Sequence, residues 1–419
     1  MTTTLYQGHA LEVLRGLEAG SVQACLTSPP YWGLRDYHCP LVSWPDGWHG
    51  SLGLEADVAS YILHLVAIFR EVKRVLRDDA ILFVNIADSY AGTGKSGGGR
   101  QWEQWAVAGM EYLGPRGGKW YPPPSGTRQK SLCLIPQRLA IALQDDGWIL
   151  RQVFPWVKRN CMPGSQQDRP TNALEWWLMC VQQPRYYCDM ESIRQPAIYA
   201  EHHEKYTSLR SGKTYNSRNA QNLAGDNGGL RGKLQDATGR TYRNTDLWFA
   251  SLAEPYGLVG VGDELVGLDV PTRAGPAGHY ATFSPELITP LLQMATSARG
   301  ACSACGSPWR RVLERTPMEI RRTYNHPAEL RTRTSGTMLK SPESRTTGWQ
   351  SQCACDAPTR PCVVLDPFAG RGTAGLAAQR LGLDAVLIEL NASDIAASRQ
   401  RLAADAPLLA HITEGSLHV

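Results

Sequence analysis

A turn near the start of the chain carries groups that suit the binding of a planar base: Thr27-Ser28-Pro29-Pro30-Tyr31-Trp32. Two consecutive prolines fix φ at both positions and lack amide protons, so their carbonyls remain as acceptors in a rigid turn. The serine adds a hydroxyl that accepts or donates a hydrogen bond, and the two aromatic rings offer stacking faces. These groups predict a pocket for a base that carries an amino group. The alternative is a rigid surface turn with a packed tyrosine and no ligand.

A second turn, far along the chain, has the composition of a cofactor-binding loop: Asp366-Pro367-Phe368-Ala369-Gly370-Arg371-Gly372-Thr373. Glycines between a strand and a helix let the backbone approach a ligand closely, and the start of the helix supplies free amides. Glu389 ends the following strand, where a carboxylate can bind both ribose hydroxyls of a nucleoside. The spacing is not that of a triphosphate-binding loop. A strand-to-helix turn without a ligand is the alternative.

Four of the eleven cysteines form two short pairs, Cys302-Ser-Ala-Cys305 and Cys353-Ala-Cys355. In a reducing compartment, clustered thiols indicate a metal before a disulfide. Four thiolates around one Zn²⁺ leave no open position for water, so the predicted role is structural. Cys362 is a fifth candidate ligand. Free thiols in a flexible insert are the alternative.

The elements that must position these groups alternate between strand and helix patterns, which predicts an α/β fold. Strand patterns occur at residues 22–26, 80–86, 148–157, 363–365 and 385–388. Helical spacing of apolar residues marks residues 58–76, 134–143 and 374–381, and further apolar segments cover 172–182 and 283–294. Both turns therefore follow predicted strands, and the glycine turn also opens a predicted helix.

Composition and charge place few limits on function. The hydrophobic content of 42% supports a full core, and the net charge of +4 permits a polyanionic partner without requiring one. The N-terminus lacks the pattern of a signal peptide, and no run approaches the ~18 apolar residues of a membrane span. We therefore expect a soluble, intracellular protein with no membrane partner.

Together the two turns resemble the signatures of the DNA amino-methyltransferases whose catalytic turn precedes the cofactor loop. The catalytic signature of that family is [Asp/Asn/Ser]-Pro-Pro-[Tyr/Phe/Trp], and the cofactor signature is Asp-Pro-Phe-x-Gly-x-Gly-Thr; both occur here in the turns quoted above. Residues 283–287 look like the element that closes over the methionine end of the cofactor. The resemblance implies a Rossmann-like, S-adenosylmethionine-dependent methyltransferase fold with a seven-stranded, mostly parallel sheet and helices on both faces.

The resemblance also implies how the chain is divided. Residues 1–190 are the catalytic half of the methyltransferase core, and residues 276–419 are the cofactor-binding half. Residues 191–275 are the expected target-recognition region, since basic residues there interleave with tyrosines. A polar insert at residues 299–362, bracketed by the cysteines, interrupts the second half.

The resemblance assigns roles residue by residue. The expected catalytic residues are Ser28, Pro29, Pro30 and Tyr31, and the expected cofactor-binding residues are Thr27, Ser284, Asp366, Pro367, Phe368, Gly370, Gly372, Thr373 and Glu389. We expect the Ser28 hydroxyl and the Pro29 carbonyl to accept the two hydrogens of the amino group, which directs its lone pair at the sulfonium methyl group. Tyr31 is expected to stack on the base.

The expected substrate is double-stranded DNA with a flipped target base, which places the protein at the nucleoid in the cytoplasm. Cytosine N4 is favoured over adenine N6, because Ser-Pro-Pro resembles the cytosine-specific members. The alternatives are an adenine-N6 enzyme, a methyltransferase that acts on RNA or protein, and a non-enzymatic nucleic-acid-binding protein with a zinc knuckle. A cognate restriction endonuclease is the expected protein partner.

One position departs from the family pattern. The family opens with Gly-Asp-x-Leu, whereas this chain has Gly8-His9-Ala10-Leu11. His9 therefore cannot make the carboxylate contact expected near the adenine of the cofactor. We interpret His9 as a polar turn residue in preference to a catalytic base.

Overall fold

The computed structural model describes the residues in these ranges: 1–33, 39–91, 128, 130–158, 168–169, 172, 174–193, 259–261, 264–269, 283–315, 319–321, 337–340, 344–407 and 411–415. Most of the predicted recognition region at residues 191–275 lies outside them. No helix among the described residues combines the length and the apolar character needed to cross a membrane.

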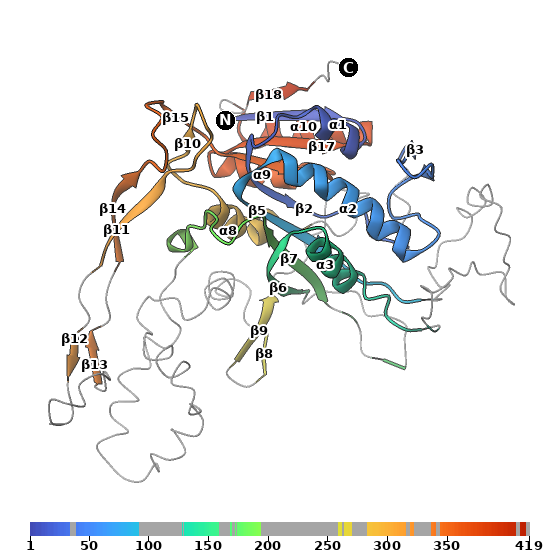
Figure 1. Cartoon of the computed structure of the whole chain (residues 1–419), viewed down its shortest axis with the longest axis horizontal. Coiled ribbons are helices and arrows are strands. Elements are labelled where there is room, and N and C mark those ends of the chain that lie inside the picture. Colours follow the sequence, from blue (N-terminus) through green and yellow to red (C-terminus); the bar gives the residue numbers. More distant parts are fainter. Residues whose placement is uncertain are drawn as a thin grey trace, which may run out of the picture.

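One large sheet organises the fold (Figure 1). Its strands are β1 (Thr2–Gln7), β2 (Val22–Thr27), β5 (Leu76–Ile86), β6 (Ile149–Val157), β7 (Leu174–Val181), β8 (Val259–Val261), β9 (Glu264–Asp269), β16 (Val363–Asp366), β17 (Asp384–Glu389) and β18 (His411–Glu414). They run in the order β18-β1-β17-β16-β2-β5-β7-β6-β9-β8. In this order β1 lies between β18 and β17, and β16 pairs with β2, so strands from both ends of the chain form one sheet.

The α/β fold is confirmed, and the sheet is larger than the seven strands expected. Seven strands, from β1 to β6 in spatial order, form the central part; β18 extends one edge, and β9 and β8 extend the other, to give ten. Strands β1, β17, β16, β2 and β5 pair in parallel, whereas β7 is antiparallel to both of its neighbours. Two of the additional strands, β8 and β18, have three and four residues, which are too few to show a periodic pattern.

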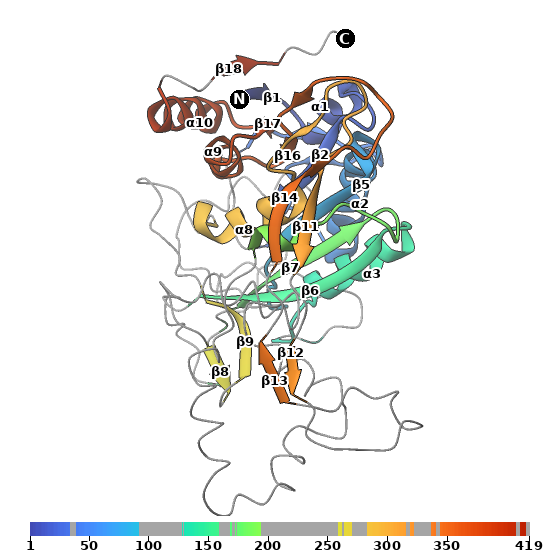
Figure 2. The same cartoon turned by 90° about the vertical axis from the view of Figure 1, so that its left-hand side faces the viewer.

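Helices cover both faces of the sheet. On one face lie α1 (Ala10–Gly16), α2 (Val58–Val75) and α3 (Ile135–Asp145), and on the other lie α8 (Pro285–Ala295), α9 (Thr373–Arg380) and α10 (Ala392–Asp405). Figure 2 shows the first group to the right of the sheet and the second group to the left. The sheet is therefore the middle layer of three.

The two faces are built by strict alternation along the strands. Leu26 and Phe83 belong to the core under α8 and α9, whereas Cys25 and Leu82 belong to the core under α2. All six residues of β2 are buried. Central parallel strands lose solvent on both faces, so they appear in sequence as continuous apolar runs rather than alternating ones.

The predicted elements agree with the structure to within a few residues, and the differences have local causes. Helix α2 begins where the Asp57 side chain accepts from the Ser60 amide at 2.9 Å, and it ends one residue early because Leu76 opens β5 directly. Strand β5 starts four residues before the predicted strand, since Leu76 already pairs with Val22.

The polar insert at residues 299–362 forms antiparallel strand pairs that leave the sheet. β10 (Ala301–Cys302) pairs with β15 (Thr359–Arg360), β11 (Arg310–Arg315) with β14 (Ser344–Gln350), and β12 (Glu319–Arg321) with β13 (Thr337–Lys340). Figure 1 shows β11 and β14 projecting beyond the sheet, with β12 and β13 farther out. We call residues 301–360 the arm.

Candidate functional site

The sheet brings the two predicted turns to one edge. β2 and β16 are neighbouring parallel strands, in register at Leu365 and Cys25. Their carboxyl ends therefore meet at the same edge, where ligands bind in open α/β sheets. The Thr27 hydroxyl donates to Asp366 Oδ1 at 2.6 Å across 339 residues of sequence.

A cavity of about 380 Å³ opens between the two turns. Its lining includes ten of the predicted catalytic and cofactor-binding residues: Ser28, Pro29, Pro30, Tyr31, Asp366, Pro367, Phe368, Gly370, Thr373 and Glu389. Thr27, Gly372 and Ser284 are not part of the lining. The Ser284 side chain is buried and accepts from the Leu287 amide at 3.3 Å, so it fixes the start of α8, while its neighbour Phe283 lines the cavity.

The serine–proline turn is held by a chain of hydrogen bonds. Ser28 Oγ donates to Tyr31 Oη at 3.2 Å, and Tyr31 Oη lies 2.8 Å from both Glu175 Oε2 and Asn85 Oδ1. A phenol has one proton, so it donates to one of these two oxygens at a time. Because the serine proton points to the phenol, the lone pairs of Ser28 Oγ remain for a ligand.

The two proline carbonyls of this turn differ. Tyr61 Oη donates to the Pro30 carbonyl at 2.8 Å, so that acceptor is engaged within the protein. Among the described residues, none donates to the Pro29 carbonyl. Of the two carbonyls, that of Pro29 is therefore the one open to a ligand.

The glycine turn is shaped by two left-handed residues and by Glu389. Gly370 and Gly372 have φ of +51° and +75°, a region that side chains disfavour. The Gly370 amide donates to Glu389 Oε2 at 2.8 Å, and the Asn391 amide donates to Oε1 at 2.9 Å. Burial raises the pKa of Glu389. Each oxygen keeps a further lone pair, so the carboxylate can still accept from a ligand.

Asp366 is almost fully buried under the glycine turn. It accepts from Thr27 and from the Phe368 amide, the latter at 3.0 Å. Burial raises its pKa to about 7, even though the Thr27 and Phe368 hydrogen bonds favour the ionised form. The carboxyl group thus fixes the two turns to each other and is costly to ionise.

Three polar residues of the site are not among those predicted from the sequence. Asn85 is a fully buried polar residue in the apolar second half of β5, and this interruption of an apolar run is visible in the sequence. Glu175 is buried at the start of β7, and Lys158 forms an ion pair with it beside the cavity. These last two residues gave no local signal, because their meeting depends on the pairing of β6 with β7 and on the loop that follows β6.

His9 lies in the cavity wall, at the N-terminal boundary of α1. Its side chain is buried, and its ring meets Trp44 edge-on at a centroid distance of 4.8 Å. Neither ring nitrogen has a hydrogen-bond partner among the described residues. Burial lowers the pKa of His9, which favours the neutral ring.

Behind Trp44 lies a second buried histidine whose polar groups are satisfied. His64 stacks on Trp44 at 4.1 Å and lies within hydrogen-bond distance of Glu55 (2.9 Å) and Asp46 (3.1 Å). Burial lowers the pKa of His64, but the two carboxylates outweigh burial and raise it overall. The two buried histidines therefore differ in their hydrogen bonding, since the ring nitrogens of His64 have partners and those of His9 have none among the described residues.

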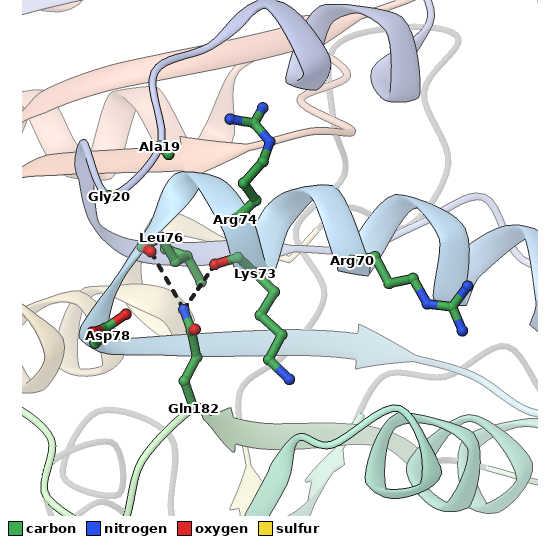
Figure 3. Close-up of a pocket in the computed structure, with 8 residues that line it drawn as sticks. All are labelled: Ala19, Gly20, Arg70, Lys73, Arg74, Leu76, Asp78 and Gln182. Atoms are coloured by element: carbon green, nitrogen blue, oxygen red, sulfur yellow. Dashed lines mark hydrogen bonds between the residues drawn. The ribbon is translucent and has the colours of Figure 1, made fainter.

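A further hollow at the opposite edge of the sheet offers no comparable site (Figure 3). It is lined by Ala19, Gly20, Arg70, Lys73, Arg74, Leu76, Asp78 and Gln182. Its three cations are engaged elsewhere: Arg70 with Asp146, Arg74 with Glu71, and Lys73 with the Gly147 carbonyl. Figure 3 shows the three side chains pointing in different directions and not converging on a common point.

The structure brings the four predicted cysteine ligands together. The sulfur atoms of Cys302, Cys305, Cys353 and Cys355 all lie within 4.8 Å of one another. Cys362 is not part of this group; its thiol faces the Ser297 carbonyl at 3.9 Å.

Comparisons with known proteins find similar chains among DNA methylases and Type II methyltransferases. The family model for N6/N4 methyltransferases, described as DNA methylase, matches residues 22–302. Type II methyltransferase M.XycI of Xanthomonas campestris pv. cyanopsidis is 34% identical over 294 residues, which are 70% of this chain and 73% of that protein. Type II methyltransferase M.Cfr9I of Citrobacter freundii is 43% identical over 192 residues, which are 46% of this chain and 58% of that protein.

Among solved structures, the chain is similar to a provisionally assigned DNA modification methylase of Thermus thermophilus in complex with S-adenosyl-L-methionine. The sequence identity is 16%, the TM-score is 0.45, and the alignment covers 99% of this chain and 100% of that one.

The raised pKa of Asp366 predicts a pH-dependent stability. A carboxyl group with a higher pKa in the folded state binds more protons folded than unfolded, so stability falls as pH rises from about 4 to about 7. Asp366→Asn removes this titration. Urea unfolding measures the free energy of unfolding of the variant and of the wild type. The value for the variant minus the value for the wild type should increase by up to about 4 kcal/mol as the pH rises across that window. A difference that stays constant from pH 4 to pH 8 would contradict the assignment.

Replacing each of the two histidines by leucine should change the free energy of unfolding in opposite directions, or leave it unchanged for His9 and lower it for His64. An unsatisfied buried polar group costs about 1–3 kcal/mol, so His9→Leu should leave the free energy of unfolding unchanged or increased. His64→Leu removes the histidine that faces Oε1 of the buried Glu55 carboxylate, which keeps the Gly53 amide on Oε2, and should destabilise by about 1–3 kcal/mol. Thermal and urea unfolding of both variants measure this. Greater destabilisation by His9→Leu than by His64→Leu would show that His9 has a structural partner.

Proposed function

The chain belongs to the N6/N4 DNA methylase family, and we propose that it transfers a methyl group from S-adenosyl-L-methionine to the exocyclic N4 amine of cytosine in double-stranded DNA. The observation that carries this proposal is the cavity that the serine–proline turn and the glycine turn share. A base-binding turn and a nucleoside-binding turn on one cavity fit a reaction between a base and a nucleoside cofactor.

The residues on the glycine side of the cavity fit the cofactor. The Glu389 carboxylate offers acceptors for ribose hydroxyls, and the backbone at Gly370 lets a ligand approach closely. His9 offers a donor and an acceptor that the described residues leave unused, at the position where the family has an aspartate. When bound, S-adenosyl-L-methionine supplies an electrophilic methyl group on a sulfonium.

The residues on the serine side activate the amine. The exocyclic nitrogen is a poor nucleophile, because its lone pair is delocalised into the ring. Ser28 Oγ and the Pro29 carbonyl accept its two hydrogens, which favours a tetrahedral nitrogen and aims the lone pair at the methyl group. The ring of Tyr31 stacks on the flipped base.

The hydrogen bonds of the turn also provide a path for the departing proton. Formation of the N–C bond breaks the S–C bond, and the nitrogen then loses one proton to Ser28 Oγ. Ser28 passes its own proton to Tyr31 Oη, and Tyr31 passes its proton to Glu175, following the donor-to-acceptor order of the resting state. Lys158 beside Glu175 holds that carboxylate in place.

Two features support the choice of substrate and partner. Ser-Pro-Pro favours cytosine over adenine, as the sequence indicates. The relatives M.XycI and M.Cfr9I are Type II methyltransferases, which supports a role in restriction–modification and a cognate endonuclease as partner. DNA as the substrate implies a cytoplasmic protein that associates with the nucleoid.

Removing the Ser28 hydroxyl should abolish most turnover without loss of cofactor binding. In single-turnover assays Ser28→Ala should be slower by about 10²-fold or more, since it loses an interaction aimed at the reacting nitrogen. Tyr31→Phe keeps the ring and breaks the proton path, so it should be slow as well. The control is Ser21→Ala, whose hydroxyl contacts only the Glu18 carbonyl at 2.7 Å among the described residues.

Mass spectrometry of the nucleosides from the methylated DNA reports the product in the same assay. N4-methylcytosine is expected, and N6-methyladenine would overturn the choice of base while leaving the reaction class intact. A wild-type rate for Ser28→Ala would overturn the mechanism.

Removing the Glu389 carboxylate should weaken cofactor binding at least about tenfold, because hydrogen bonds to a charged group contribute about 1.5–3 kcal/mol. Isothermal titration calorimetry with S-adenosyl-L-methionine measures the effect in Glu389→Ala. Asp384→Ala is the matched control, since this acid lies at the opposite end of the same strand, where its side chain accepts from the Thr2 amide. Equal affinity in both variants would show that Glu389 does not hold the cofactor.

A further inference from the structure

We propose that Cys302, Cys305, Cys353 and Cys355 bind one structural Zn²⁺ ion that clamps the base of the arm. Their four sulfur atoms lie within 4.8 Å of one another, although 47 residues separate the two pairs. Thiolates at about 2.3 Å from a tetrahedral zinc ion lie about 3.8 Å apart, so small side-chain rotations suffice to close the site.

The first pair is presented by a tight turn of the backbone. The Cys302 amide donates to the Ser307 carbonyl, and the Gly306 amide donates back to the Cys302 carbonyl, both at 2.8 Å. Gly306 has a φ of +70°, and a Cβ there would lie 3.0 Å from Gln23 Nε2. The turn therefore needs glycine, and it directs Cys302 and Cys305 toward one point.

The second pair is fixed to the first by the chain that returns from the arm. The Ser303 amide donates to the Pro358 carbonyl at 2.9 Å, and Cys302 pairs with Thr359 across β10 and β15. The Ser351 hydroxyl lies 3.4 Å from Cys353 Sγ. Entry and exit of the arm thus meet at the four sulfurs.

Burial does not explain why these thiols converge. Unliganded cysteines behave as small apolar residues and are usually buried, whereas Cys305 and Cys355 are exposed and Cys353 is half-buried. Strands β11 and β14 contain no fully buried residue. A segment without a core of its own gains stability from a bound metal, because the site does not exist in the unfolded chain.

The position of the cluster excludes a role in methyl transfer. Gln23, at the start of β2, donates to the Gly306 carbonyl at 3.2 Å, and Arg77, near the start of β5, donates to the Cys305 carbonyl. The cavity lies at the opposite ends of these strands, beyond Ser28. Four thiolates also fill a tetrahedral zinc site and leave no position for a substrate.

The clamp complements an ion pair farther along the arm. Arg311 in β11 binds Asp189 through two nitrogens, with Nη2 to Oδ2 at 2.9 Å, and stacks on Trp349 of β14 at 4.6 Å. The metal would fix the chain segments that lead into β11 and out of β14. Arg311 fixes β11 to β14 near the start of β11. Together they set the direction in which the arm projects (Figure 1).

Metal analysis of the full-length chain, purified under reducing conditions and reconstituted with Zn²⁺, tests the proposal. Plasma mass spectrometry should find close to one zinc ion per chain in the wild type and in Cys188→Ser, whose half-buried thiol lies outside the cluster. Cys353→Ser/Cys355→Ser should lose nearly all of it. Reconstituted wild type without zinc, or a double variant that keeps a full equivalent, would overturn the proposal.

A measurement on the wild type covers the case in which the double variant fails to fold. Bound zinc should slow alkylation of Cys302, Cys305, Cys353 and Cys355 relative to the chelator-treated protein, and tryptic peptides identify each site. Equal alkylation with and without metal would overturn the proposal. Chelation should leave the affinity for S-adenosyl-L-methionine unchanged, so failure of the zinc site and failure of the methylase proposal are distinguishable.

Discussion

The parallel pairing of β2 with β16 is the constraint on which the rest of the site depends. These strands come from opposite ends of the chain, and each is followed directly by one of the two turns that line the cavity. Once they are neighbours in register, both turns must emerge at the same sheet edge. The buried hydrogen bond from Thr27 to Asp366 then fixes the turns to each other, at the cost of a carboxyl group that resists ionisation.

The cavity concentrates polar groups that a stable core would avoid. Asp366 and Glu389 have raised pKa values because they are buried, and His9 keeps two ring nitrogens without partners among the described residues. The surrounding layers are conventional, with apolar strands between two helix layers. Asp366, Glu389 and His9 all line the cavity, as is usual where local rules are broken for function.

The arm is stabilised in a different way from the central sheet. Strands β11 and β14 contain no fully buried residue, so they depend on contacts at the base of the arm. The bonds from Gln23 and Arg77 hold it against the starts of β2 and β5, opposite the cavity. A change in the arm therefore need not disturb the edge of the sheet where the cavity lies, and the two parts of the molecule can vary separately.

The sequence by itself determined the fold class, the central strands and helices, and the residues of both turns. Those features depend on local pattern: the continuous apolar run of β2, the helical spacing of α2, and turn residues whose backbone demands are fixed by their chemistry. The sequence also indicated the two cysteine pairs. Only the tertiary structure decided that Tyr31 binds Glu175, that Ser284 caps a helix outside the cavity lining, that His9 is buried beside Trp44, and that the sheet has ten strands. Each of these depends on the register and approach of segments distant in sequence, which local periodicity does not encode.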